Sequence, residues 1–315
     1  PQGMVEFKGL GAELMFFKGA IDKLGIDVQI IRGSNNKFKS AVEPLMYSSM
    51  SAENREQTMT YMNALWNQML IGVKEKTGVS ANMLNEIADS MYVRSAKTAL
   101  QYDLVDELIY EDELLAILKE ESGTKIGEDL NLVSFKKYAS KEAKSYDRKN
   151  KNSNIAVVYA AGGIQSGKGN ATTIGSETTA GAIREAREDD EIKAVVLRIN
   201  SPGGSALASD VIWREVVLTQ KVKPIIVSMG DVAASGGYYI ACAADKIYAQ
   251  PNTITGSIGV FGIIPNIGPA LEKNFGITFD RAKTNHHSVL SLNKALTDEE
   301  KHLIQLGVDD IYNDF

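Results

Sequence analysis

The sequence predicts an α/β fold made of βαβ units around mainly parallel sheets. In the second half of the chain, short apolar runs alternate with helical patterns, and continuous apolar runs are typical of parallel strands buried on both faces. We expect strands at 155–160, 194–200, 224–229 and 246–249, and helices at 177–188, 205–219 and 235–244. With 315 residues, 44% of them hydrophobic, the chain is long enough for two domains with a large core.

The first 121 residues have a more helical pattern. Strands are expected at 4–8 and 28–32, helices at 13–24, 51–76, 82–90 and 111–121, and a short helix turning into a strand over 95–110. Within 51–76, Met59, Met62 and Leu65 begin a run of apolar residues at helical spacing. The polar, lysine-rich residues 122–153 predict a linker, with a short strand at 130–135.

The chain also contains an internal repeat. Residues 18–32 resemble residues 270–283, and residues 50–69 resemble residues 296–315. We therefore predict a tandem duplication: 1–121 is the C-terminal part of a first repeat, 122–153 is a linker, and 154–315 is a second, truncated repeat. Because the chain lacks a first methionine and stops inside a helical pattern, we expect it to be a fragment.

Composition excludes several classes of protein. A net charge of -6, without a Lys/Arg block, argues against a nucleic-acid partner. Cys242 is the single cysteine, which excludes an intramolecular disulfide and a multi-cysteine zinc site, and we expect its thiol to be packed in the core. No apolar run reaches the length of a membrane span, and the first residues do not resemble a signal peptide.

The segment GDVAASGGYYIACAAD (230–245) carries the first chemical signal. It follows the apolar run PIIVSM, so Ser235 is expected where a strand meets a helix. A hydroxyl at that position is exposed at the end of a sheet, where a helix N-terminus favours developing negative charge. The arrangement suits a nucleophile, and it also suits an ordinary serine N-cap.

A second signal is AVVLRINSPGGSALASD (194–210). Its strand ends near Asn200, and Gly203 and Gly204 precede the next helix. Two glycines let the backbone approach a substrate closely, and their N–H groups can form an oxyanion hole. Because this strand and the strand before Ser235 should be neighbours, donors and nucleophile are expected at one edge of the sheet.

The residues alone leave the base open. A Ser-His-Asp triad would need His286, His287 or His302, none of which stands in a triad-like local context. The motif G-x-S-x-G is absent, since Ala233 takes the place of its first glycine. The other base is a lysine whose pKa is lowered by burial, and the best local candidate is Lys39, which lies in the apolar segment NKFKSAVEPLMY.

GDVAASGGYYIACAADKIYAQPNTITGSIGV, NSPGGS and FKSAVEP together resemble the signal peptide peptidase A family, in its long, duplicated form. The resemblance implies a Clp protease/crotonase-like fold and a serine protease with a Ser–Lys dyad. It assigns Ser235 as the nucleophile, Lys39 as the general base, Gly203 and Gly204 as the oxyanion hole, and Ser257 as the residue that orients the lysine. This chemistry requires no metal or cofactor.

The resemblance also implies substrates and partners. The expected substrates are cleaved signal peptides and other apolar peptides, and the expected assembly is a homo-oligomer, a tetramer in the family. A membrane segment upstream of Pro1 would anchor the catalytic part on the periplasmic side of a bacterial inner membrane. Two alternatives stay open, namely a crotonase-type acyl-CoA enzyme and a non-catalytic scaffold on the same fold.

The duplication predicts how the site is assembled. In the second repeat the position of Lys39 falls near 285–291, where no lysine matches, and Lys283 and Lys294 flank the gap. The nucleophile therefore belongs to one repeat and its base to the other. We expect the site to form where the two repeats meet.

Overall fold

A computed structural model of the chain describes residues 3, 5–33, 36–125, 127–138, 154–285, 288 and 291–315. Its contacts divide the chain into two compact units. The larger consists of Ala12–Ala64 and Asn154–Phe315, and the smaller of Pro1–Gly11 and Leu65–Ser153. The segment that carries Lys39 therefore lies in the same unit as the one that carries Ser235. The predicted repeats are defined by similar sequence rather than by contacts, so their boundaries stay a prediction.

A parallel sheet forms the centre of the larger unit. Its order is β2-β6-β7-β8, with β9 also pairing with β7, and every one of these pairings is parallel. The strands are β2 (Ile155–Ala161), β6 (Ala194–Ser201), β7 (Ile225–Ala234), β8 (Lys246–Tyr248) and β9 (Ile254–Gly256). The predicted α/β class and parallel sheet are confirmed.

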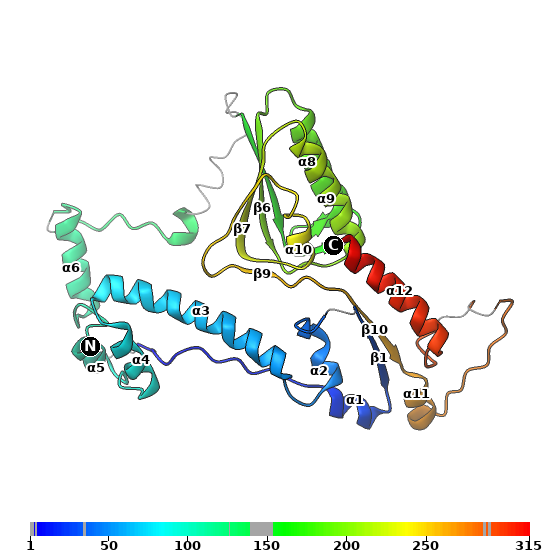
Figure 1. Cartoon of the computed structure of the whole chain (residues 1–315). Helices are drawn as coiled ribbons and strands as arrows, with labels where there is room; N and C mark the ends of the chain where they lie inside the picture. Colours follow the sequence, from blue (N-terminus) through cyan, green and yellow to red (C-terminus); the bar gives the residue numbers. More distant parts are fainter. Residues whose placement is uncertain are drawn as a thin grey trace. The chain divides into compact units, whose positions relative to one another are not determined.

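Two helices cover one face of this sheet. Helices α8 (Ser176–Glu188) and α9 (Ala206–Gln220) pack against each other beside β6 and β7 (Figure 1). Fully buried side chains such as Leu197, Ile212 and Val227 fill the core between the two layers. A small sheet of order β3-β5-β4 precedes α8, with β3 (Gly163–Gln165), β4 (Gly169–Asn170) and β5 (Thr173–Gly175).

A two-stranded ribbon joins the N-terminal segment to the C-terminal one. Strand β1 (Asp27–Arg32) pairs antiparallel with β10 (Phe261–Asn266), with Arg32 opposite Phe261. Helix α12 (Asp298–Asp314) packs on this ribbon through a small core that contains Ile31, Leu296 and Val308. The remaining elements here are α1 (Lys18–Leu24), η1 (Ser40–Val42), α2 (Glu43–Met46), α10 (Gly236–Tyr239) and α11 (Gly268–Phe275).

The segments that the predicted duplication matches contain similar helices. Helices α1 and α11, which fall in matching segments, both end at a left-handed glycine, Gly25 with φ 73° and Gly276 with φ 67°. A long helix follows in each of the two matching segments: α3 (Ala52–Thr77) in the first and α12 in the second. Glycine is favoured at such a helix end because its positive φ costs no side-chain clash.

The smaller unit is helical. It consists of the C-terminal part of α3 with α4 (Ala81–Asp89), α5 (Ala96–Gln101) and α6 (Glu111–Glu121). Its core gathers Phe7, Leu70, Leu84 and Ile87, and the Phe7 and Trp66 rings lie 5.3 Å apart.

Several local predictions were wrong. No strand forms at 5–8, at 102–110 or at 130–134, because none of these segments finds a partner strand. The helix expected at 235–244 ends at Tyr239. The turns that follow contain both i→i−3 and i→i−4 backbone hydrogen bonds. Cys242, expected in the core, is exposed because it lies in these turns.

Candidate active site

Ser235 lies at the sharp junction between β7 and α10. Its backbone has φ 53° and ψ −123°, values that non-glycine residues rarely adopt, and its N–H donates to Gly256 O at 2.8 Å. Strained residues of this kind gather at functional sites because the surrounding structure must hold them. The predicted position between strand and helix is confirmed, and the strain is a feature that the sequence did not reveal.

Glycines let the turns around Ser235 approach one another. A Cβ on Gly203 would lie 2.8 Å from Ser235 Cβ, and one on Gly236 would lie 2.5 Å from Ser209 Oγ. Real Cβ atoms do not come so close, so larger residues would force the two turns apart. The SPGG and SGG segments are therefore packed against each other at the carboxyl ends of β6 and β7.

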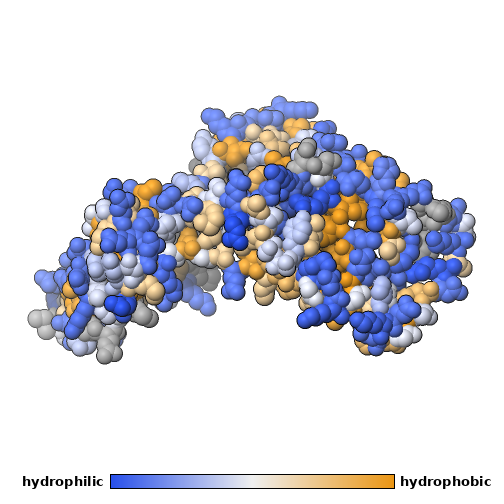
Figure 2. All heavy atoms as spheres, turned by 60° about the horizontal axis from the view of Figure 1, so that its bottom comes forward, coloured by the Kyte–Doolittle hydropathy of each residue, from blue (hydrophilic) through white to orange (hydrophobic). Residues whose placement is uncertain are grey.

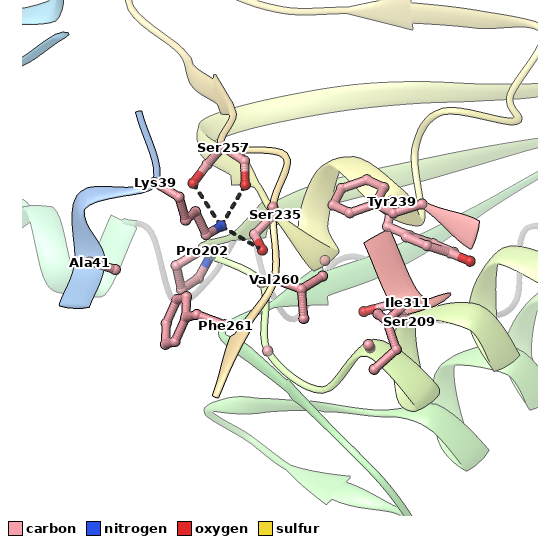
Figure 3. A pocket seen from close by; sticks show the side chains of 16 residues that line it. Lys39, Ala41, Pro202, Ser209, Ser235, Tyr239, Ser257, Val260, Phe261 and Ile311 are labelled. Atoms are coloured by element: carbon pink, nitrogen blue, oxygen red, sulfur yellow. Dashed lines mark hydrogen bonds between the residues drawn. The ribbon is translucent and has the colours of Figure 1, made fainter. Parts of the chain in front are cut away.

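Lys39 reaches Ser235 from the loop after β1. Its Nζ lies 3.2 Å from Ser235 Oγ, 3.1 Å from Ser257 Oγ and 2.5 Å from Ser257 O. Figure 3 shows Ser235 and Ser257 converging on this amine. The structure thus brings together three side chains that the family resemblance singled out, from positions 196 and 218 residues apart in the chain.

The Lys39 amine is buried without a counter-charge. The residue is 8% exposed, and burial lowers its pKa below the ordinary value of 10.5. In the described parts of the chain, no carboxylate forms an ion pair with Lys39, whereas its neighbour Lys37 pairs with Glu53. Desolvation favours the neutral amine, which is the form that can accept a proton.

Ser257 is held so that it offers Lys39 two oxygens. It has a positive φ of 52°, and it follows Gly256, whose φ is 76°. This backbone bend directs both the hydroxyl and the carbonyl oxygen of Ser257 toward Lys39 Nζ. The two contacts fix the direction of the amine.

The two N–H groups predicted for the oxyanion hole differ in their hydrogen bonding. Gly203 N–H already donates to Ser201 Oγ at 3.1 Å, so the geometry does not support it as a donor to substrate. Among the described residues, nothing accepts a hydrogen bond from the N–H of Gly204 or of Gly236, and Gly204 N lies 3.2 Å from where a Cβ of Gly236 would be. The sequence does contain a signal for Gly236, since the first N–H groups of any helix lack an intrahelical acceptor.

The site opens into a pocket of about 470 Å³ with a mostly apolar wall. Val260, Phe261, Ile311 and Phe315 contribute to this wall, and Figure 3 shows Pro202 and Phe261 beside Lys39 and Ser235. Hydrophobic side chains also gather on the right-hand half of the face shown in Figure 2.

Tyr239 forms a polar contact in the wall of this pocket. Its hydroxyl donates to Asp210 Oδ1 at 3.1 Å, and its ring lies 4.8 Å from that of Phe315. Burial, followed by the charge of Asp210, raises the pKa of Tyr239 to about 12, so this tyrosine stays protonated at neutral pH.

Of the other candidate bases, only His302 lies among the described residues. His302 is exposed on α12, and no hydrogen bond joins it to Ser235, whereas His286 and His287 lie outside the described residues. In the second repeat, Lys294 is paired with the buried carboxylate of Glu300 at 2.6 Å.

Comparison with known proteins gives a consistent result. The model of "Peptidase family S49" matches residues 1–125 and 218–315, and the model "Clp protease" matches residues 149–255. The chain is 35% identical to "Protease 4" of Salmonella typhi over 100% of its own length and 51% of the relative. It is also 39% identical to "Serine protease SPPA, chloroplastic" of Arabidopsis thaliana, over 80% of this chain and 37% of that protein.

The chain spans about half the length of the bacterial relative, so the similarity covers only part of that protein. The Clp protease match agrees with the Clp-like fold that the motifs predicted. In the parts of the chain that the structure describes, no helix has the length and apolarity needed to cross a membrane. Across the same residues, no group of three His, Cys, Asp or Glu side chains could hold a metal ion.

Proposed function

Because the chain belongs to peptidase family S49, in agreement with the resemblance drawn from its motifs, we propose that it is the catalytic part of a serine endopeptidase with a Ser–Lys dyad. The observation that carries the proposal is the 3.2 Å contact between Lys39 Nζ and Ser235 Oγ, at a buried amine that has no carboxylate partner among the described residues. A serine needs a neighbouring base to become a nucleophile, and this amine meets the geometric requirement for one.

In the proposed reaction, neutral Lys39 accepts the proton of Ser235 as Oγ attacks a peptide carbonyl. The Lys39 ammonium then donates that proton to the leaving amine, which gives an acyl-enzyme. Lys39 next takes a proton from water as the water oxygen attacks the ester, and it returns that proton to Ser235 Oγ when the peptide acid leaves. Ser257 orients the amine throughout, because it contacts Nζ through two oxygens.

The negative charge of each tetrahedral intermediate needs hydrogen-bond donors. We assign this role to the N–H groups of Gly204 and Gly236, which lie beside Ser235 and have no acceptor among the described residues. Gly203 then has a different role, since its missing side chain allows the close approach of Ser235.

The substrates in this proposal are apolar peptides, including signal peptides after their release from preproteins. The apolar wall of the pocket supports an apolar substrate, while the identity of the peptides rests on the family. We also propose, by the same resemblance, a homo-oligomer of four subunits anchored to a bacterial inner membrane with the active site on the periplasmic side.

Active-site labelling tests the proposal directly. In the full-length protein, a fluorophosphonate should modify Ser235, as shown by peptide mass spectrometry, and a fluorogenic apolar peptide should be hydrolysed. Ser235→Ala and Lys39→Met should each abolish both reactions. Lys37→Met is the matched control, because Lys37 is two residues away but exposed and paired with Glu53. Full activity in Lys39→Met would refute the dyad.

The same assays separate the alternatives. An acyl-CoA enzyme would bind a thioester and leave the peptide intact. A scaffold protein would react with neither the fluorophosphonate nor the peptide, although it would assemble normally.

A further inference from the structure

The loop that carries Lys39 is fastened through Asn36. The Asn36 carbonyl accepts the Lys39 N–H at 3.1 Å and also a hydrogen bond from Arg32 Nη2. The same guanidinium nitrogen donates to Lys39 O at 3.2 Å. The backbone of Lys39 is therefore fixed to β1 by contacts that do not involve its amine.

The Asn36 side chain links this loop to the segment that carries Ser257. Asn36 Nδ2 donates to Val260 O at 2.5 Å, and Gly33 N–H donates to the same carbonyl at 3.3 Å. Val260 is three residues beyond Ser257, directly before β10. Asn36 thus joins the two segments whose separation determines how Lys39 meets Ser257.

The carbonyl oxygen of the same side chain lacks a partner. Asn36 is 5% exposed, and no described group donates to its Oδ1. A Cβ added to Gly259 would lie 2.5 Å from this oxygen and 3.3 Å from Lys39 Cδ. Asn36 Oδ1 and the side chain of Lys39 therefore lie on the same side of Gly259. A buried acceptor without a donor normally lowers the stability of the fold by about 1–3 kcal/mol. Such a cost is accepted where the atom has a function.

We propose that Asn36 is a positioning residue for Lys39: Nδ2 holds the lysine loop on the Ser257 segment, and the buried Oδ1 stabilises the ammonium that forms when Lys39 takes the proton of Ser235. The proposal rests on the proposed Ser–Lys dyad. It explains how a buried amine with no carboxylate partner in the described part of the chain can become charged during the reaction.

Other charges near the site do not already fill this role. Charged groups on the elements that form the site include Arg32 on β1, Glu43 on α2, Lys37 with Glu53 on the start of α3, Asp210 on α9, Asp231 on β7, and Asp309, Asp310 and Asp314 on α12. The pKa of Lys39 is shifted by burial alone, so none of these groups sets it. Glu43 is instead held by Ser51 and Asn54.

The pH dependence of fluorophosphonate labelling tests the proposal in the full-length protein. The labelling rate should fall at low pH, and we call this part of the profile the acid limb. Asn36→Asp places a carboxylate at Oδ1, which raises the pKa of Lys39, so the acid limb should move to higher pH by about one unit or more. Asn36→Leu has nearly the same shape but no dipole, so the limb should move to lower pH. For peptide hydrolysis by this variant, kcat should fall at least about tenfold with KM unchanged.

Asn266→Asp is the matched control, because Asn266 is also buried but its Oδ1 accepts from Gly268 N–H, away from Lys39. Its profile should match that of the wild type. A wild-type acid limb in folded Asn36→Asp or Asn36→Leu would overturn the proposal, and Asn36→Leu decides alone if the aspartate variant does not fold. Failure of the dyad itself would appear differently, as wild-type protein that does not label at Ser235.

Discussion

Replacement of Ser257 by alanine should slow the reaction without abolishing it. The hydroxyl supplies one of the two contacts between residue 257 and Lys39 Nζ, at 3.1 Å, while the main-chain oxygen supplies the other, at 2.5 Å. A hydrogen bond to a charged group contributes roughly 1.5–3 kcal/mol, which corresponds to a loss of about 10- to 150-fold in kcat. The remaining carbonyl contact prevents a complete loss. Since Ser257 acts through Lys39, KM should stay unchanged.

Ser257→Gly separates the hydroxyl from the backbone. Both variants lack Oγ, but glycine also relieves the strain of φ 52°, which amounts to about 1 kcal/mol for an L-residue. The glycine variant should therefore melt at a higher temperature than the alanine variant while showing the same loss in kcat. Hydrolysis of a fluorogenic peptide and thermal unfolding give the two readouts. A glycine variant with the wild-type rate would refute the orienting role of the hydroxyl.

Three further predictions concern packing and charge. Gly259→Ala should abolish labelling of Ser235, because its Cβ would lie 2.5 Å from Asn36 Oδ1 and 3.3 Å from Lys39 Cδ; normal labelling of the folded variant would contradict this. Lys294→Met should lower the stability by about 3 kcal/mol in chemical denaturation, because it leaves the buried Glu300 carboxylate without its cation; an unchanged midpoint would count against the pair. Lys294 lowers the pKa of Glu300 from 4.5 to about 2. The ion pair therefore stabilises the fold fully above pH 4.5, and this stabilisation disappears as the pH falls toward 2. Glu300→Gln should remove this dependence of the unfolding free energy on acid pH.

The activity should depend on pH through Lys39. The reaction requires the neutral amine, and burial lowers the pKa of that amine from 10.5. The labelling rate should therefore fall as the pH is lowered through the pKa of Lys39 and reach a plateau above it. A midpoint at or above 10.5 would show that the site does not favour the neutral amine.

The parallel sheet and its two covering helices could be predicted from the sequence, because buried strands and amphipathic helices have distinct apolar patterns. The strand expected at 4–8 does not form over its described residues 5–8, and none forms at 102–110. A strand also needs a partner strand, which the local sequence does not specify. The helix after Ser235 was predicted too long because its apolar residues continue past Tyr239 into turns.

The sequence by itself determined the types of residue in the site: a serine between a strand and a helix, a glycine pair after the neighbouring strand, and a lysine in an apolar segment. Tertiary structure decided which atoms meet. The β1–β10 ribbon brings Lys39 to Ser235 across 196 residues. Among the described residues, the N–H groups of Gly204 and Gly236 have no acceptor, whereas that of Gly203 donates to Ser201. These outcomes depend on distances between segments far apart in the chain, which no local pattern encodes. For the same reason the sequence did not point to Asn36, because its proposed role depends on the contacts of its loop with Gly259 and Val260.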